Sequence, residues 1–131
     1  MTNEYLMVSN LNRCVFTGDT CMVGGCGRFL EGDAAGCVYA MNVMRTLPDD
    51  TKMFPAKEWA LKNLQFGIKV EPENKDIKDA LLKYTEIIKE GNPAIPSLLS
   101  EEKKYNVFMR NSETCMSVTY KHCQTLKPAW A

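Results

Sequence analysis

Residues 14–34 read CVFTGDTCMVGGCGRFLEGDA and join a short apolar run to a loop that is crowded with glycine. The run from Cys14 to Gly18 predicts a short buried strand, because Gly18 bounds it. Residues 24–32 contain four glycines. This predicts a loop whose backbone adopts conformations that favour glycine, or that lies close to another part of the chain. Asp19 stands between the two, so the stretch predicts a carboxylate at the end of a strand.

The rest of the chain is mostly helical in pattern. Apolar residues recur at steps of three and four, and proline, glycine and capping residues mark the ends of the segments. The expected elements are a helix over 34–47 capped by Asp33, a strand over 52–54 ended by Pro55, a helix from Lys57 to Val70, a helix between its cap Asn74 and Gly91, an extended connector over 92–96, and a short helix capped by Ser97 that runs to Tyr105. We expect the tail after Arg110 to be weakly ordered.

This order of elements predicts an α-rich α/β fold with two parallel strands joined by a helix. Two strands and one helix cannot bury both faces of a sheet. We therefore expect an exposed sheet edge and face that further chain on the N-terminal side, a second copy or a protein partner covers.

Composition narrows the choice of partners and location. The 131 residues have a formal net charge of zero, which argues against a nucleic acid or an anionic membrane as partner. Residues 1–5 lack the basic start of a signal peptide, so we expect a cytoplasmic protein, with a mitochondrial location as the alternative. Six cysteines would then be reduced thiols.

Several motifs in this order resemble the glyoxalase II (hydroxyacylglutathione hydrolase) family of the metallo-β-lactamase superfamily. The resemblance covers residues 14–110 and is carried by VFTGDT at 15–20, GCGRF at 25–29, EG at 31–32, NL at 63–64, Phe66, VEP at 70–72, PS at 96–97 and YNVFMR at 105–110. It implies that residues 1–56 are a truncated remnant of the C-terminal half of a metallo-β-lactamase αββα sandwich. Residues 57–131 would be the helical C-terminal domain.

The resemblance also implies a reaction. The family hydrolyses the thioester S-D-lactoylglutathione to D-lactate and glutathione, in the detoxification of methylglyoxal. It uses two zinc ions, with iron or manganese tolerated, whose bridging hydroxide attacks the thioester carbonyl. Asp19 lies at the position of the carboxylate that bridges the two metals. The implied partner is glutathione or a glutathione thioester.

The chain departs from the family at its other metal ligands. It has no H-x-H-x-D-H motif, and its one histidine is His122, in the tail. Lys57 stands where the family has its final histidine ligand, and a protonated lysine has no lone pair to give a metal. We therefore expect that no catalytic set is intact and that this chain by itself binds no metal. The plainer interpretation of Asp19 is a side chain that accepts amide hydrogen bonds from the following loop.

The positions on the glutathione side are partly changed as well. Arg28 keeps a charge that the family uses for the tripeptide, whereas Leu30 and Trp59 replace two tyrosines. Trp59 could equally be a core residue, and Arg28 a solvated loop residue. Three hypotheses remain open: a catalytically inactive, truncated hydrolase-like protein; a module that binds glutathione, an anion or a protein; and an active hydrolase that a missing N-terminal half completes.

Overall fold

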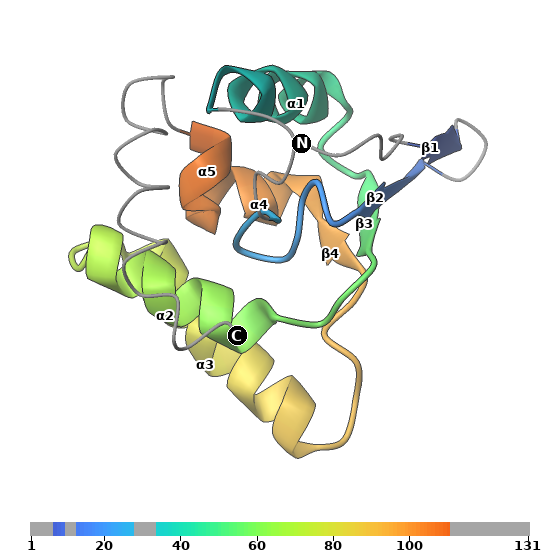
Figure 1. Ribbon diagram of the computed structural model, residues 1–131. Coiled ribbons are helices and arrows are strands. Elements are labelled where there is room, and N and C mark those ends of the chain that lie inside the picture. The colour runs from blue at the N-terminus through green and yellow to red at the C-terminus, as the bar shows by residue number, and fades with distance from the viewer. Residues whose placement is uncertain (1–6, 10–12, 28–33, 111–131) are drawn as a thin grey trace.

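The computed structural model describes residues 7–9, 13–27 and 34–110, and it has helices and a small sheet in one packed unit (Figure 1). The elements in chain order are β1 (Met7–Ser9), β2 (Cys14–Gly18), α1 (Ala34–Thr46), β3 (Lys52–Pro55), α2 (Ala60–Val70), α3 (Lys75–Lys89), β4 (Ser97–Leu98), α4 (Leu99–Tyr105) and α5 (Val107–Arg110). The predicted α-rich α/β class is confirmed at this level. The predictions for Asp33 and for the tail after Arg110 concern residues outside the described ranges.

The sheet has four strands in the order β1-β2-β3-β4, where the sequence predicts two. β2 and β3 are parallel, with Val15 opposite Met53 and Gly18 opposite Pro55. β1 and β4 each add one antiparallel neighbour to this pair. β4 follows α2 and α3 and pairs with β3, the strand that precedes these two helices, so residues 52–55 and 97–98 lie side by side (Figure 1).

The two faces of the sheet differ in exposure. Val15 and Met53 are fully buried in the core that the helices share with the sheet. On the other face Phe16 is 48 % exposed, and its ring stacks on that of Phe54 with 5.2 Å between centroids. An aromatic pair thus lies on the sheet face that points away from the core. This agrees with the expectation that too few elements are present to cover both faces of the sheet.

Two predicted helix starts are wrong. α2 begins at Ala60 rather than Lys57, because the amide of Ala56 still donates to the carbonyl of Gly18 and keeps the chain paired beyond β3. Ser97 lies in β4 and does not cap α4, which begins at Leu99 without a side-chain cap. The backbone of Ser97 pairs with Met53 of β3, so it is held in an extended conformation. The hydroxyl of Ser97 donates to Glu102 at 3.1 Å and does not accept from a helix amide.

The predicted ends of the longest helix are confirmed. The Oδ1 atom of Asn74 accepts from the amides of Asp76 and Ile77 at 2.9 and 3.3 Å, which caps α3. Gly91 follows its last turn with φ of 80°, a left-handed conformation that favours glycine. In the described part of the chain, no helix combines the length and the apolar character needed to cross a membrane.

Candidate functional site

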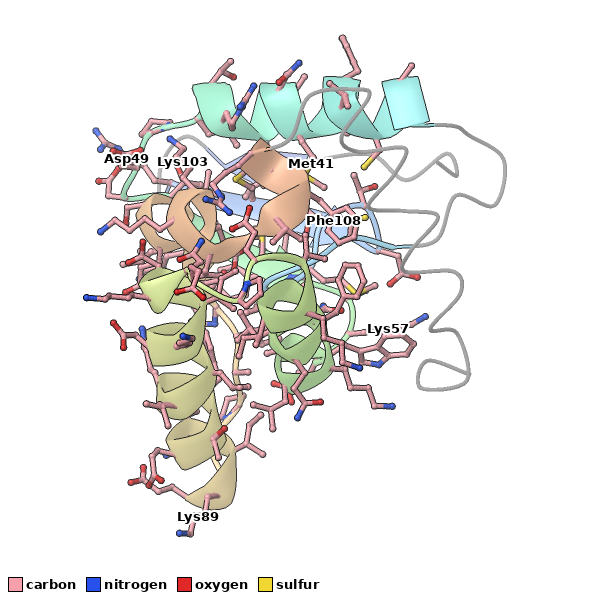
Figure 2. All side chains as sticks on the ribbon, turned by 90° about the vertical axis from the view of Figure 1, so that its left-hand side faces the viewer. Met41, Asp49, Lys57, Lys89, Lys103 and Phe108 are labelled. Atoms are coloured by element: carbon pink, nitrogen blue, oxygen red, sulfur yellow. The ribbon has the colours of Figure 1, made fainter. Side chains whose placement is uncertain are left out.

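Asp19 and Lys57 lie together at one edge of the sheet. Their strands β2 and β3 are parallel, so the carboxyl ends of both strands meet there. The Nζ atom of Lys57 is 3.2 Å from the Oδ2 atom of Asp19, and the two side chains are 51 % and 34 % exposed. Figure 2 shows Lys57 at the surface, far from the core residues Met41 and Phe108. The structure therefore brings the candidate carboxylate and the predicted replacement of the histidine ligand into one half-exposed ion pair.

The glycine-rich loop that follows Asp19 is a buried structure. Residues 20–26 are buried, and Met22 and Gly25 exchange backbone hydrogen bonds of 2.9 and 3.1 Å around a tight turn. Gly24 has φ of 71° in this turn. A Cβ atom at Gly27 would lie 2.1 Å from the carbonyl oxygen of Asp19, so no larger residue fits there unless the backbone shifts. The prediction that this loop needs glycine, for its conformation or for a close approach, is confirmed in its described part, by Gly24 for the first reason and by Gly27 for the second.

Three buried side chains from the helical half satisfy the backbone of this loop. Asn63 of α2 donates to the carbonyl of Val23 at 3.1 Å. Asn106 donates to the carbonyls of Met22 and Gly25 at 3.2 and 3.1 Å. The carboxylate of Glu102 accepts from the amide of Gly24 at 3.2 Å. The loop beside Asp19 is therefore shaped by residues that lie forty or more positions further along the chain.

Glu102 is the centre of this network. Its side chain is fully buried, and its carboxylate also accepts from the hydroxyls of Ser97 and Tyr105 and from the amide of Asn106, at 3.1, 2.8 and 3.0 Å. Burial raises the pKa of Glu102 to about 7, although these donors pull in the opposite direction. Glu102 is not among the predicted site residues. A signal was present, because Glu102 lies three residues after the apolar Leu99 and three before Tyr105, on one face of α4.

Trp59 lies beside the ion pair, in the position just before α2. The Nζ atoms of Lys57 and Lys62 each lie 5.7 Å from the centre of its ring. Trp59 is half-buried and packs against the core, so it has both the structural and the surface character that the sequence leaves open. Lys62 is not among the predicted site residues either, and Arg28 lies outside the described residues. The site thus has two cations near one aromatic ring, next to one carboxylate.

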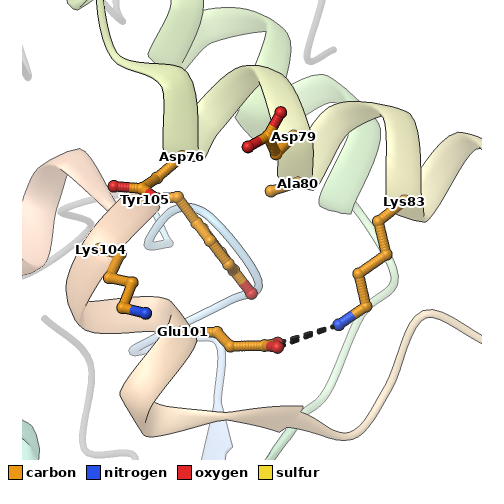
Figure 3. Close-up of a pocket in the computed structure, with 7 residues that line it drawn as sticks. All are labelled: Asp76, Asp79, Ala80, Lys83, Glu101, Lys104 and Tyr105. Carbon is orange, nitrogen blue, oxygen red and sulfur yellow. Dashed lines mark hydrogen bonds and ion pairs between the residues drawn. The ribbon is translucent and has the colours of Figure 1, made fainter.

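A shallow pocket of about 180 Å³ lies between α3 and α4 (Figure 3). Asp76 and Lys83 of α3 line one side, and Glu101 and Lys104 of α4 line the other. Lys83 and Glu101 form a 3.0 Å ion pair across it. None of the residues that line the pocket belongs to the Asp19–Lys57 site.

The residues at the Asp19 edge do not fit a metal centre. The group paired with the carboxylate is the ammonium of Lys57, which donates hydrogen bonds and has no lone pair for a metal. A catalytic metal takes about three protein ligands. Across 7–9, 13–27 and 34–110, no three His, Cys, Asp or Glu side chains gather in a way that could hold a metal ion.

Comparisons with known proteins agree with the pattern of motifs. Residues 58–128 match the family model described as the C-terminus of hydroxyacylglutathione hydrolase. The chain is 39 % identical over 105 residues to a hydroxyacylglutathione hydrolase of Rippkaea orientalis, across 80 % of this chain and 41 % of the relative. It is 44 % identical over 100 residues to a hydroxyacylglutathione hydrolase-like protein of Gallus gallus, across 76 % of this chain and 36 % of the relative.

The extent of these matches defines which part of the relatives is represented. The chain spans about two fifths of the length of the curated relatives that it matches. The matched model describes the C-terminus of the family, and it covers α2 and all the described elements after it. On these grounds the chain belongs to the glyoxalase II, or hydroxyacylglutathione hydrolase, family and represents the C-terminal part of it.

Proposed function

We propose that this chain is a hydroxyacylglutathione hydrolase-like protein whose 131 residues, on their own, do not hydrolyse glutathione thioesters by a two-metal mechanism. One observation carries the proposal: the Nζ atom of Lys57 lies 3.2 Å from the carboxylate of Asp19. In this pair a positive side chain neutralises the carboxylate, which is the role that metal ions have at a bridging carboxylate. The pair leaves the charge of the site balanced without a metal.

The position of the pair in the fold supports this proposal. The segments next to a catalytic carboxylate in an enzyme must be rigid if the group is to be positioned well. Here the loop after Asp19 is fixed by Asn63, Glu102 and Asn106. The fixed loop is a scaffold that could position a catalytic carboxylate. The two side chains that it positions, Asp19 and its partner Lys57, form an ion pair and not a set of metal ligands.

The finer assignment of the fold is part of the same proposal. We assign residues 1–56 to a metallo-β-lactamase-like segment and 57–131 to the helical C-terminal domain. The parallel pair β2–β3 and the helix α1 that connects the two strands support the first part of this assignment. The exposed Phe16 on the sheet supports coverage of that face by a protein partner or a second copy.

A second candidate function is binding of glutathione or a related anion without hydrolysis. Lys57 and Lys62, each near the Trp59 ring, favour it, because two ammonium groups close together can bind a carboxylate-rich peptide. An active hydrolase completed by the N-terminal half of the family remains the third alternative. In that complex Lys57 would still stand at the position of a metal ligand.

Metal content and thioester hydrolysis test the first proposal together. The purified chain is incubated with zinc, separated from unbound metal, and assayed for zinc per chain and for hydrolysis of S-D-lactoylglutathione. We expect substoichiometric zinc and no hydrolysis above background. Lys57→His should increase the zinc retained, because it restores one ligand, whereas Lys89→His at the far end of α3 should not (Figure 2). About two zinc ions per wild-type chain, with hydrolysis, would overturn the proposal.

Calorimetry with glutathione tests the second function. If the two lysines bind the peptide, millimolar glutathione should release or absorb heat with the wild-type chain. The double substitution Lys57→Ala and Lys62→Ala should then abolish the signal, while Lys89→Ala should leave it intact. No heat with the wild-type chain at millimolar ligand would remove this candidate.

A further inference from the structure

Two buried thiols lie in contact near the site. Cys26 ends the buried part of the glycine loop, and Cys37 lies in the first turn of α1, eleven residues later. The thiol of Cys37 faces the Sγ atom of Cys26 at 4.0 Å. Both side chains are almost fully buried, at 2 % and 0 % exposure. Their proximity therefore follows from the packing of the loop against the helix.

The other described cysteines are less suited to reaction with this pair. The Cys21 thiol is as buried as the pair, and the nearby charge of Glu102 distinguishes it, since burial, followed by this charge, raises the pKa of Cys21 well above its ordinary value. The thiol of Cys21 is also near two other polar groups, the carbonyl of Met22 and the amide of Asn106, each at 3.9 Å. Cys14 is half-buried in β2, on the strand that precedes the loop.

We propose that Cys26 and Cys37 form a reversible disulfide when the chain meets a two-electron oxidant of the peroxide class. A disulfide has a sulfur–sulfur distance of about 2.05 Å, so the two atoms must approach by about 2 Å. Because both thiols are buried, the oxidant reaches them through local opening of the structure. The proposal stands independently of the proposed function.

The reaction balances with hydrogen peroxide as the oxidant. The thiolate of one cysteine attacks a peroxide oxygen, the oxygen–oxygen bond breaks, and a sulfenic acid and one water form. The second thiol then attacks the sulfenic sulfur, the sulfur–sulfur bond forms, and the hydroxyl leaves as a second water. Two thiols are oxidised to one disulfide, and both peroxide oxygens are reduced to water.

The disulfide would act on the candidate site through the loop. Gly27, the neighbour of Cys26, packs directly against the backbone of Asp19. A covalent bond between Cys26 and α1 therefore restricts the segment behind the Asp19–Lys57 pair. In the reduced chain only noncovalent packing keeps this segment in place.

Peptide mapping tests the proposal. The chain with Cys14→Ser, Cys115→Ser and Cys123→Ser is treated with hydrogen peroxide, denatured, alkylated with N-ethylmaleimide and cleaved with trypsin. Cleavage after Arg28 separates residues 14–28 from 29–45. We expect these two peptides to be joined by a bond that dithiothreitol breaks, and fragmentation to place that bond at Cys26 and Cys37. In the same background Cys26→Ala should abolish the linked peptides, whereas Cys21→Ala should retain them.

The unmodified chain provides a measurement that does not depend on the folding of variants. Its oxidised form should unfold at a higher urea concentration than its reduced form, and dithiothreitol should reverse the difference. Alkylation of both Cys26 and Cys37 after oxidation would overturn the proposal. Overoxidation of Cys26 without linked peptides, or a bond at Cys21 in place of Cys26, would overturn it equally.

Discussion

Two carboxylates of this chain border the same loop, and one of them is partly exposed whereas the other is fully buried. Asp19 is 34 % exposed, and the ammonium of Lys57 lies 3.2 Å from it. Glu102 is fully buried, and it accepts hydrogen bonds from Gly24, Ser97, Tyr105 and Asn106. The first carboxylate is balanced by a positive charge near water, and the second by neutral donors inside the protein.

The difference in burial predicts that the Glu102 network stabilises the fold, whereas the Asp19–Lys57 pair contributes little to stability. Removal of one partner from a buried polar network leaves the others unsatisfied, at a large cost. An exposed ion pair contributes little, because water and salt replace each partner. The Glu102 network therefore shapes the loop, and the groups at the Asp19 edge can change without loss of the fold. Under the proposed function, Lys57 at a metal-ligand position is such a change.

The largest expected effect comes from Glu102→Ala. The substitution removes the acceptor of Gly24, Ser97 and Asn106, so it should lower the free energy of unfolding by about 3–5 kcal/mol. Urea unfolding measures the change, with Glu86→Ala on the exposed face of α3 as the control, at about 0.5 kcal/mol or less. Equal effects of the two substitutions would contradict the central role of the network.

The pH dependence of stability sharpens the same comparison. Burial raises the pKa of Glu102 to about 7 in the folded chain, above the ordinary 4.5. The folded state therefore favours the protonated acid. This contribution is complete below pH 4.5 and is lost as the pH rises to 7, a decrease of about 3 kcal/mol in the free energy of unfolding.

Unfolding in urea at several pH values measures this dependence. Glu102→Gln keeps the shape of the side chain and cannot ionise, so the decrease that Glu102 causes between pH 4.5 and 7 should be absent from this variant. A wild-type chain and a Glu102→Gln variant with the same pH profile would show that Glu102 ionises as an ordinary carboxylate does.

The sequence predicts the parts of the fold that depend on local signals. The cap at Asn74, the glycine at 91 and the apolar period identify α3, and the glycine-rich stretch identifies the loop. β1 and β4 escape prediction because strands of three and two residues carry no alternation, and their pairing depends on strands distant in sequence. The prediction that Ser97 caps a helix is wrong for the same reason, because Ser97 pairs with the distant strand β3.

The candidate site also has residues that the sequence identifies and residues that only the packing of the fold shows. Asp19 follows a recognisable strand, and the family resemblance points to Lys57, so the sequence identifies both members of the ion pair. That they contact each other depends on the parallel register of β2 and β3. Glu102 and Lys62 are single charged residues within helices, where most such residues face water. Only the packing of the helices shows that one is buried and the other lies beside Trp59.

Gly27→Ala should have an intermediate effect. The new Cβ atom would lie 2.1 Å from the carbonyl oxygen of Asp19, so the backbone must move, at a cost of about 1–3 kcal/mol. Gly67→Ala in α2 is the matched control, because its Cβ atom meets Ile77 at an ordinary 3.4 Å. Alanine is also the better helix former, so the control should be neutral or stabilising by up to about 1 kcal/mol. Thermal unfolding measures both, and an equal loss in both variants would contradict the close approach at Gly27.

The smallest expected effect is that of Lys57→Met, which breaks the ion pair and keeps most of the side-chain volume. The loss should be about 0.2–1 kcal/mol, because both partners are partly exposed to water. A double-mutant cycle with Asp19→Asn isolates the pair, and its coupling energy should decrease as salt is added. A coupling of several kcal/mol that salt does not reduce would mean that the pair is part of the scaffold, and the contrast with Glu102 would fail. A small, salt-sensitive coupling would mean that the fold tolerates a change at this edge, which is what a lysine at a metal-ligand position requires.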